Sequence, residues 1–285
     1  MTAGEQWAAE QLDDLRAARF TPRAWQRFLR ASFTGAKHTR RARTGLARQT
    51  RAWAALGLAA DPVLRAWASA AGFQTPTRRG FVTWWLAVCV MLDWHLGMVE
   101  GPAGEQRDRL AACDALTLAR LWSLPHLGAQ SSPAGGSAPA FAALIGLGAA
   151  SDALDGVLAR RAGPTRLGRD LDKAADALVV AVACRAARRA GWLPTRTARL
   201  ATARSVLPVA VAAGSYFATG HRPAVDTIGP GRLLAPVLLG GLAAAPFAHR
   251  TGALMTGGAS ALALALAVTR LSAESSAHRQ GEAPN

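Results

Sequence analysis

The sequence predicts an all-α protein with several membrane-spanning helices, and three observations support this fold class. Hydrophobic residues fill 51% of the 285 positions although 18% are charged, so the apolar residues are concentrated in runs. These runs are long and rich in Ala and Leu, without the apolar–polar alternation of membrane β-barrel strands. The last runs are apolar around nearly the whole helical circumference, where a soluble helix would carry a polar stripe. A large buried all-α bundle is the alternative.

Residues 1–79 form a basic region that precedes most of the apolar sequence. They hold 14 Arg or Lys against five Asp or Glu, together with four Trp residues. Basic helices with aromatic residues are typical of an anionic membrane surface, so we expect a helical cytoplasmic or membrane-surface extension. Nucleic-acid binding is the rival interpretation, but no zinc finger, helix-turn-helix spacing or RNA-binding motif supports it. The polar N-terminus also lacks the apolar core of a secretory signal peptide.

Seven later runs are candidates for membrane spans, which need roughly 17–25 mostly apolar residues. In order they are Phe81–Val99, Leu116–Gln130, Ala138–Leu158, Ala174–Ala187, Leu200–Thr219, Leu233–Ala248 and Gly252–Thr269. Pairs of small residues, such as Gly240-Gly241 and Gly257-Gly258, would let these helices approach closely in lipid. The three cysteines form no CxxC pattern, which indicates neither a disulfide framework nor a zinc site.

The first of these runs creates a conflict of topology. The basic N-terminus favours the cytoplasmic side, and a single crossing at Phe81–Val99 would place the following segments on the other side. Residues 80–113 are therefore expected to hold either an interfacial helix or an extra transmembrane helix, followed by a linker. The interfacial placement is favoured, because it keeps both ends on one side.

The most informative segment is Ser151–Asp176, which contains two pairs of aspartates. Asp152 and Asp155 are three residues apart, and Asp172 and Asp176 are four apart, so each pair lies on one face of a helix. Two such faces turned toward each other would bring four carboxylates together. Buried carboxylates are costly in apolar helices and repel one another. Divalent cations relieve both effects, and ligand sets made only of oxygen suit Mg²⁺, Mn²⁺ or Ca²⁺.

The surrounding residues fit a phosphate-bearing ligand. Gly156 and Ala159 would leave room for a nucleotide against the helix, and nearby arginines would supply positive charge for phosphates. Two divalent ions can bind a pyrophosphate and stabilise the charge that develops when a phosphoryl oxygen is displaced. Helix caps and charges at the membrane edge are the alternative explanation for the aspartates.

This segment resembles the signature of the CDP-alcohol phosphotransferase (CDP-alcohol phosphatidyltransferase) family. The pattern D-x2-D-G-x2-A-R…G-x3-D-x3-D matches at Asp152, Asp155, Gly156, Ala159, Arg160, Gly168, Asp172 and Asp176. Seven residues separate Arg160 from Gly168, one fewer than is usual in the family. Eight matched letters in so short a window are far more specific than a lone glycine motif.

The resemblance extends on both sides of the signature. Asp114–Pro125 looks like the polar start of the family's first core helix, with Thr117 and Arg120 at its inner end. Arg204 and the stretch Gly229–Arg232 are similar to the later helices of phosphatidylglycerophosphate synthases. The resemblance therefore implies a six-helix transmembrane catalytic core over residues 114–272, with a disordered tail at 273–285.

The family implies how such a site works. Two divalent metal ions, Mg²⁺ or Mn²⁺, would be held by Asp152, Asp155, Asp172 and Asp176. Asp176 would also act as general base toward the alcohol hydroxyl. The cytidine and its pyrophosphate would be held by the remaining signature residues and by the start of the first core helix, namely Gly156, Ala159, Arg160, Gly168, Thr117 and Arg120.

The resemblance also implies the reaction and its setting. The expected enzyme is a homodimer in the cytoplasmic membrane with its active site facing the cytoplasm. It would move a phosphatidyl group from CDP-diacylglycerol to a small alcohol, with glycerol 3-phosphate favoured over inositol phosphate, serine or phosphatidylglycerol. A catalytically silent membrane scaffold of the same fold is the alternative, and the short gap before Gly168 supports it. A transporter would predict internal repeats, which the sequence does not show.

Overall fold

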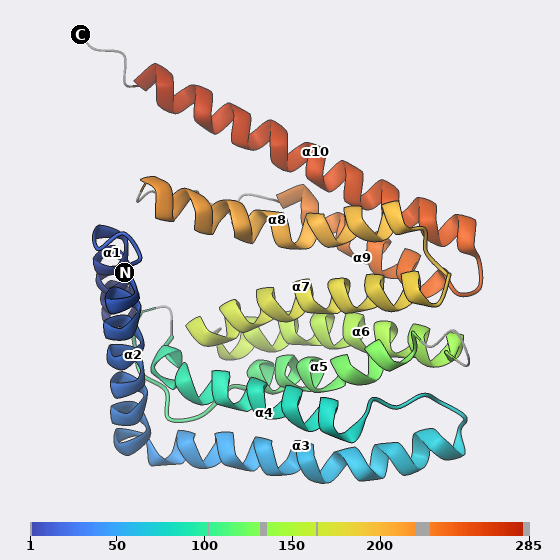
Figure 1. Cartoon of the computed structure of the whole chain (residues 1–285), viewed down its shortest axis with the longest axis horizontal. Helices are drawn as coiled ribbons and strands as arrows, with labels where there is room; N and C mark the ends of the chain where they lie inside the picture. Colours follow the sequence, from blue (N-terminus) through green and yellow to red (C-terminus); the bar gives the residue numbers. More distant parts are fainter. Residues whose placement is uncertain (1, 102, 132–135, 164, 220–228, 282–285) are drawn as a thin grey trace. The chain divides into compact units, whose positions relative to one another are not determined.

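The computed structural model describes residues 2–101, 103–131, 136–163, 165–219 and 229–281, and helices are its main secondary structure (Figure 1). Within these residues no strand forms, and one isolated bridge joins Glu100 to Gln106. The fold class predicted from the sequence is confirmed. The helices are α1 (Ala3–Ala17), α2 (Pro22–Ala42), α3 (Thr44–Ala70), α4 (Arg78–Trp94), η1 (Leu96–Met98), α5 (Ala112–Ala129), α6 (Ala138–Ala162), α7 (Arg166–Arg189), α8 (Thr195–Thr219), α9 (Gly229–Ala244) and α10 (His249–Gly281).

The chain divides into two compact units. Unit 1 comprises residues 1–129 and 150–179, and unit 2 comprises residues 130–149 and 180–285. Unit 1 holds the N-terminal helices, α5 and the segment with the four aspartates. Each unit is described by itself below.

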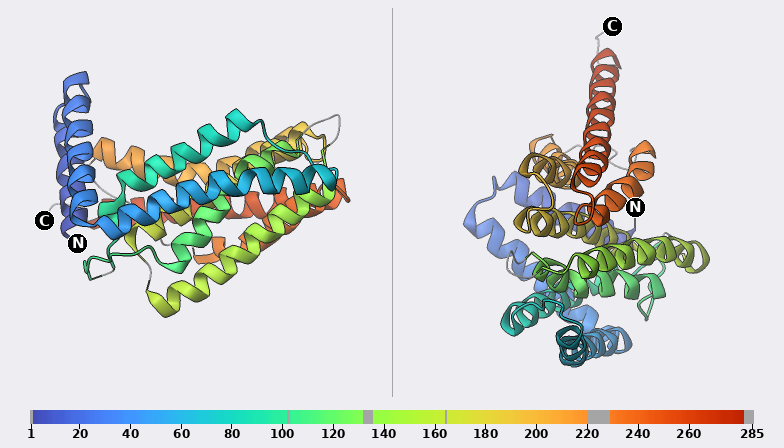
Figure 2. Two further views of the ribbon diagram at one scale, coloured as in Figure 1. Left: turned by 90° about the horizontal axis from the view of Figure 1, so that it is seen from below. Right: turned by 90° about the vertical axis from the view of Figure 1, so that its right-hand side faces the viewer.

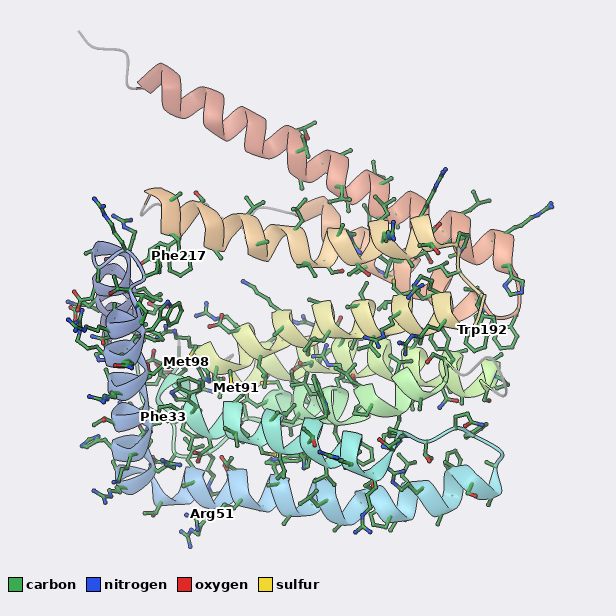
Figure 3. All side chains as sticks on the ribbon, viewed as in Figure 1. Phe33, Arg51, Met91, Met98, Trp192 and Phe217 are labelled. Atoms are coloured by element: carbon green, nitrogen blue, oxygen red, sulfur yellow. The ribbon has the colours of Figure 1, made fainter. Side chains whose placement is uncertain are left out.

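Unit 1 begins with α1 and α2, which run across the direction of the helices that follow (Figure 1). The α1 helix starts with a capping box, in which Thr2 accepts from the Glu5 amide and Glu5 accepts from the Thr2 amide. The α2 helix carries six basic residues and no acidic one. Figures 1 and 2 show α1 and α2 running across the direction of α3 and α4. Phe33 of α2, labelled in Figure 3, stacks on Trp94 of α4 with ring centroids 4.7 Å apart.

Helices α3, α4 and α5 pack side by side in the same unit. One core cluster joins the start of α3 to the end of α4 and the start of α5, through Leu46, Leu92 and Leu118. At the other end, Phe81 of α4 packs edge-on against Trp122 of α5, with ring centroids 5.7 Å apart. Two helices that precede the predicted core, α3 and α4, are thereby packed against its first helix, α5.

The apolar run predicted at Phe81–Val99 is not one helix. The α4 helix starts earlier, at Arg78, where Thr77 caps it by accepting from the Gly80 amide, and it ends at Trp94. The chain then turns through η1, and the buried Arg43 guanidinium donates to the carbonyl oxygens of Leu96 and Val99, at 3.2 Å each. The helix ends between Asp93 and His95, which are the one charged residue and the one histidine of this run.

Unit 2 is built around α8, α9 and α10. The α9 and α10 helices pack closely at Gly241, which has no side chain. A Cβ atom at this position would lie only 2.7 Å from the Thr256 amide nitrogen. The predicted role of small residues is thus confirmed for Gly241, whereas Gly258 has no described atom within 4 Å of such a Cβ. Trp192, labelled in Figure 3, sits in the turn between α7 and α8 and packs edge-on against Phe141.

Two stretches of the described residues are long and apolar enough to cross a membrane by length and composition. They are Ala138–Leu158 and His249–Thr269, and both coincide with predicted runs. The α10 helix continues to Gly281, although residues 273–285 were expected to be disordered. Five of the eight residues from 273 to 280 are the helix formers Ala, Glu, Arg and Gln, and none of the eight is Gly or Pro.

Candidate functional site

The four aspartates converge within unit 1, on the last part of α6 and the first part of α7. Asp152 and Asp155 share one face of α6, and Asp172 and Asp176 share one face of α7. One carboxylate oxygen from each of Asp152, Asp172 and Asp176 lies within 4.8 Å of the others. The two helices therefore face each other as the spacing predicted, and the carboxylates meet in a small volume.

The guanidinium of Arg120 on α5 lies among all four carboxylates. Its Nη1 is 3.3 Å from Asp152 and 2.7 Å from Asp176, and its Nη2 is 2.9 Å from Asp155 and also contacts Asp172. The Arg120 side chain is 3% exposed. From the sequence, Arg120 was expected to bind the cytidine and its pyrophosphate. The contact of Arg120 with every aspartate was not predicted.

Thr117 lies one turn before Arg120 on α5 and completes the polar cluster. Its hydroxyl donates to Asp155 Oδ2 at 3.0 Å and accepts from Arg120 Nη2 at 3.3 Å. Asp155 is consequently held by two donors and is 10% exposed, whereas Asp176 is 54% exposed. One side of the cluster is fixed by α5, and the other side is open to a ligand.

The donor set fits divalent cations. Four carboxylates and one guanidinium leave three negative charges uncompensated, and all the acidic ligand atoms are oxygen. Hard divalent ions prefer such ligands and keep open positions for water or phosphate oxygens.

Gly168 has a structural role in the first turn of α7. Its amide donates to Thr165 Oγ1 at 2.8 Å, and the Thr165 hydroxyl donates to Asp114 Oδ1 at 3.1 Å. A Cβ atom on Gly168 would overlap the Asp114 carboxylate and lie 2.9 Å from Thr165 Oγ1. Burial raises the pKa of the Asp114 carboxyl at the start of α5. Glycine is therefore required here by the close packing of α7 on Asp114.

The other signature residues lie along α6. A Cβ atom on Gly156 would meet only the end of the Arg160 side chain, at 3.4 Å, so the surface beside Gly156 is open. Arg160 is exposed. The side chain of Ala159 lies outside the described residues, as does that of Arg232. Arg204 belongs to unit 2 and is described only within it.

Arg166, expected from the sequence to serve phosphates, is instead engaged by acidic residues of the N-terminal region. Its Nη1 is 3.2 Å from Glu100 and its Nε is 4.0 Å from Glu5. The Arg166 amide also donates to the Glu100 carbonyl oxygen at 2.9 Å. The Thr2 amide, with help from Arg166, holds the pKa of Glu5 below its usual value.

The contacts that Glu100 makes with Thr2 and Arg166 were not predicted from the sequence. The Glu100 side chain is buried, and it accepts from the Thr2 hydroxyl at 2.6 Å as well as from Arg166. Arg107, a few residues later, donates to the Gly163 carbonyl oxygen at 2.9 Å. The loop between α6 and α7, which carries the shortened gap, is thus fastened to the segment before α5.

A family model described as CDP-alcohol phosphatidyltransferase matches residues 110–270. The matched stretch starts just before α5 and ends within α10, and it includes all four aspartates, Thr117 and Arg120. No curated protein and no solved structure matches the chain.

Proposed function

Because the chain belongs to the CDP-alcohol phosphatidyltransferase family, a family of membrane transferases for substituted phosphate groups, we propose that it moves the phosphatidyl group of CDP-diacylglycerol to glycerol 3-phosphate and releases CMP. The family accounts for transfer from a CDP-linked donor to an alcohol acceptor. The observation that carries the proposal for this chain is the group of four carboxylates around Arg120, which lies inside the matched residues.

The aspartates are proposed to hold two ions, Mg²⁺ or Mn²⁺. Asp152, Asp155 and Asp172 would act as ligands, and Asp176 would complete the site. Such ions supply charge stabilisation at the phosphoryl oxygens when they are bound. The uncompensated negative charge of the cluster and the exposure of Asp152, Asp172 and Asp176 support this assignment.

Asp176 is proposed as the general base. Its carboxylate takes the proton of the acceptor hydroxyl, and the hydroxyl oxygen forms a bond to the phosphorus next to the lipid. The bond from that phosphorus to the bridging oxygen breaks, and CMP leaves with the electron pair. Asp176 suits this role because its carboxylate is 54% exposed at the open side of the cluster.

The donor is proposed to lie against α6 at Gly156. The open surface there and the exposed Arg160 would accommodate the cytidine and its pyrophosphate. Ala159, Gly168 and Thr117 are assigned to the same ligand on the family resemblance alone, since Gly168 packs on Asp114 and Thr117 is buried. Arg120 would turn from the carboxylates toward a phosphate when the ions are bound. This exchange of partners is consistent with its place at the centre of the cluster.

The acceptor and the cellular setting are also proposals. Glycerol 3-phosphate is favoured by the likeness at Arg204 and Gly229–Arg232. Inositol phosphate, serine and phosphatidylglycerol are the competing acceptors. The enzyme is proposed to be a multi-pass homodimer in the cytoplasmic membrane with the aspartates facing the cytoplasm. It would consist of a basic extension at 1–79, a linker region at 80–113 and a catalytic core at 114–272.

The proposal is tested with purified protein, CDP-diacylglycerol and a panel of labelled alcohols, with Mn²⁺ or Mg²⁺ present. We expect label to enter the lipid phase with glycerol 3-phosphate and an equal amount of CMP to be released. Transfer to another alcohol would overturn the choice of acceptor. Binding of CDP-diacylglycerol without transfer to any alcohol would favour the silent scaffold instead.

A further inference from the structure

Helices α3 and α4 precede the matched residues 110–270, and neither is among the two stretches of the described residues that length and hydropathy alone mark as able to span a membrane. Their lengths and contacts are nevertheless compatible with a membrane hairpin. The α3 helix has 27 residues and the α4 helix has 17, which correspond to about 40 Å and about 26 Å. The hydrocarbon layer of a bilayer is roughly 30 Å thick. In the 26 residues from Ala52 to Thr77, the only charges are Asp61 and Arg65.

This charged pair is turned into the protein. Arg65 Nε donates to Asp61 Oδ2 at 2.6 Å, and the Arg65 guanidinium also donates to the Pro76 carbonyl oxygen at 2.5 Å. The Asp61 side chain is buried, and its Oδ1 lies 3.6 Å from His126 Nε2 on α5. An intramembrane charge pair is tolerated where it is neutralised and shielded from lipid by protein, as it is here.

The inner face of the hairpin packs on α5, and its indole groups are paired. Trp122 of α5 donates to the Gly57 carbonyl oxygen at 3.0 Å, and Trp84 of α4 donates to the Leu121 carbonyl oxygen at 2.8 Å. Trp85 of α4 donates to the Ala54 carbonyl oxygen at 3.1 Å. The Trp85 ring lies directly against the backbone at Gly57, where any side chain would overlap it.

The outer faces of both helices are apolar and exposed. Val63 is 72% exposed on α3, and Leu56 and Trp67 lie on the same helix with more than half of their surface free. On α4, Val90 is 59% exposed and Leu86 lies one turn before it. Large apolar side chains presented outward, with the charges turned inward, are the arrangement expected in lipid and the reverse of that expected in water.

The contacts also fix the direction of each helix. Gly57 and Asp61 of α3 lie beside Trp122 and His126 of α5, four residues apart on each helix, so α3 runs parallel to α5. The α4 helix runs the opposite way, since its first residues reach His126 and its last residues reach the start of α3. Figures 1 and 2 show α3 and α4 side by side with opposite directions.

From these contacts we infer that α3 and α4 form a membrane-spanning hairpin beside α5, with the outer faces of both helices in contact with lipid acyl chains. Two crossings return the chain to the side from which it started. The N-terminal helices α1 and α2 therefore lie on the same side of the membrane as Thr117, Arg120 and the aspartates. This replaces the interfacial placement of Phe81–Val99 and removes the conflict of topology.

The distribution of charge agrees with the hairpin. Eleven Arg or Lys residues precede Ala52, on the side of the aspartates, whereas the turn between α3 and α4 is followed by only Arg78 and Arg79. Basic residues remain preferentially on the cytoplasmic side. The hairpin thus places the strongly basic region where the charge rule and the proposed active site both require it.

The inference is tested by labelling single cysteines in sealed membrane vesicles of known orientation with an impermeant maleimide. The variants are Ala71→Cys in the α3–α4 turn, Gln26→Cys on α2, Asp170→Cys on α7, and Val63→Cys and Val90→Cys on the outer faces. All five positions are exposed in the structure, so differences in labelling report the surroundings. The buried native thiols Cys89, Cys113 and Cys184 set the background, measured on the unmodified chain.

We expect Ala71→Cys to react from the side opposite to Gln26→Cys and Asp170→Cys. Val63→Cys and Val90→Cys should react from neither side until detergent and denaturant are added. Reaction of Ala71→Cys on the same side as Gln26→Cys would overturn the hairpin, as would rapid labelling of both valine positions in sealed vesicles. Oxidative crosslinking of Val63→Cys into a covalent dimer would show that a second copy, and not lipid, covers this face.

The labelling pattern does not depend on catalysis, so its outcome is separate from that of the transfer assay. A chain that shows the expected sidedness but releases no CMP would keep the hairpin and lose the proposed reaction. A chain that transfers phosphatidyl groups while Ala71→Cys reacts on the side of Asp170→Cys would keep the reaction and lose the hairpin.

Discussion

Replacement of Arg120 by Gln removes the only guanidinium that the described residues place among the four carboxylates. Of its four ion pairs, the one with Asp155 is buried on both sides, with side-chain exposures of 3% and 10%. The other three carboxylates are each more than a third exposed, so their pairs contribute about 0–1 kcal/mol each. Loss of one partner of a buried pair costs about 3–5 kcal/mol. Thr117 still donates to Asp155, which favours the lower end, about 3 kcal/mol.

The effect should depend on metal ions. In the presence of a chelator, Arg120→Gln should unfold about 5–10 °C below the unmodified protein. Because the variant has four uncompensated charges where the unmodified protein has three, Mn²⁺ should raise its unfolding temperature by more than it raises that of the unmodified protein. Tryptophan fluorescence during heating, with and without Mn²⁺, measures both shifts in detergent-solubilised protein.

Arg109→Gln is the matched control. It makes the same chemical change at an exposed position away from the cluster. It should leave both unfolding temperatures unchanged. The reasoning would be refuted if Arg120→Gln unfolded at the same temperature as the unmodified protein under chelation. It would also be refuted if Mn²⁺ raised both unfolding temperatures equally, because Arg120 and the ions would then not share the carboxylates.

Three further predictions concern the residues that hold the aspartate cluster in place. Gly168→Ala should lower stability by about 1–3 kcal/mol through overlap with Asp114, and the double variant with Asp114→Ala should recover part of that loss in chemical unfolding. Burial raises the folded-state pKa of Asp114 above its usual value of 3.8. Its contribution to stability is therefore present below about pH 3.8 and is lost as pH rises through the folded-state pKa. Asp114→Asn should reduce this loss of stability when the free energy of unfolding is measured against pH. Glu100→Gln and Arg166→Gln should each lower the free energy of unfolding, because each breaks the ion pair that holds the loop before Gly168. A double-mutant cycle should give a coupling free energy of about 1–3 kcal/mol between the two residues. Additive effects would mean that the pair is not formed.

The aspartate cluster was predicted from the sequence because helical spacing alone determines which residues share a face. Asp152 with Asp155 and Asp172 with Asp176 meet as expected once the two helices pair. The contact of Arg120 with all four carboxylates could not be predicted in the same way. It depends on how far a long side chain reaches from α5, and residue spacing on α6 and α7 holds no information on that distance.

The N-terminal region was predicted only as basic and helical, and the reasons for this are physical. Asp61 and Arg65 are four residues apart, a spacing that allows an ion pair on one helix face, but only the three-dimensional contacts reveal that this pair is turned against α5. Glu100 carries no periodicity or motif, because its partners Thr2 and Arg166 are distant in the chain. Such long-range ion pairs leave no local signal in one sequence.

The shortened gap before Gly168 ends at a residue that is joined to α5. Thr165 accepts from the Gly168 amide and donates to Asp114, which links the start of α7 to the start of α5. The spacing that supported a silent scaffold is therefore compatible with four aspartates that meet around Arg120. The arrangement of the aspartates does not depend on the length of this loop.

The most direct test of the central claim is the initial rate of CMP release from CDP-diacylglycerol with Mn²⁺ and glycerol 3-phosphate, compared between Asp176→Asn and Asp170→Asn. Both changes remove one carboxylate from α7, but Asp170 is exposed and lies outside the cluster. We predict that Asp176→Asn lowers the rate by about 10²–10⁴-fold and that Asp170→Asn leaves it within a factor of about two. Equal rates for Asp176→Asn and the unmodified protein would contradict the assignment of this cluster as the catalytic centre.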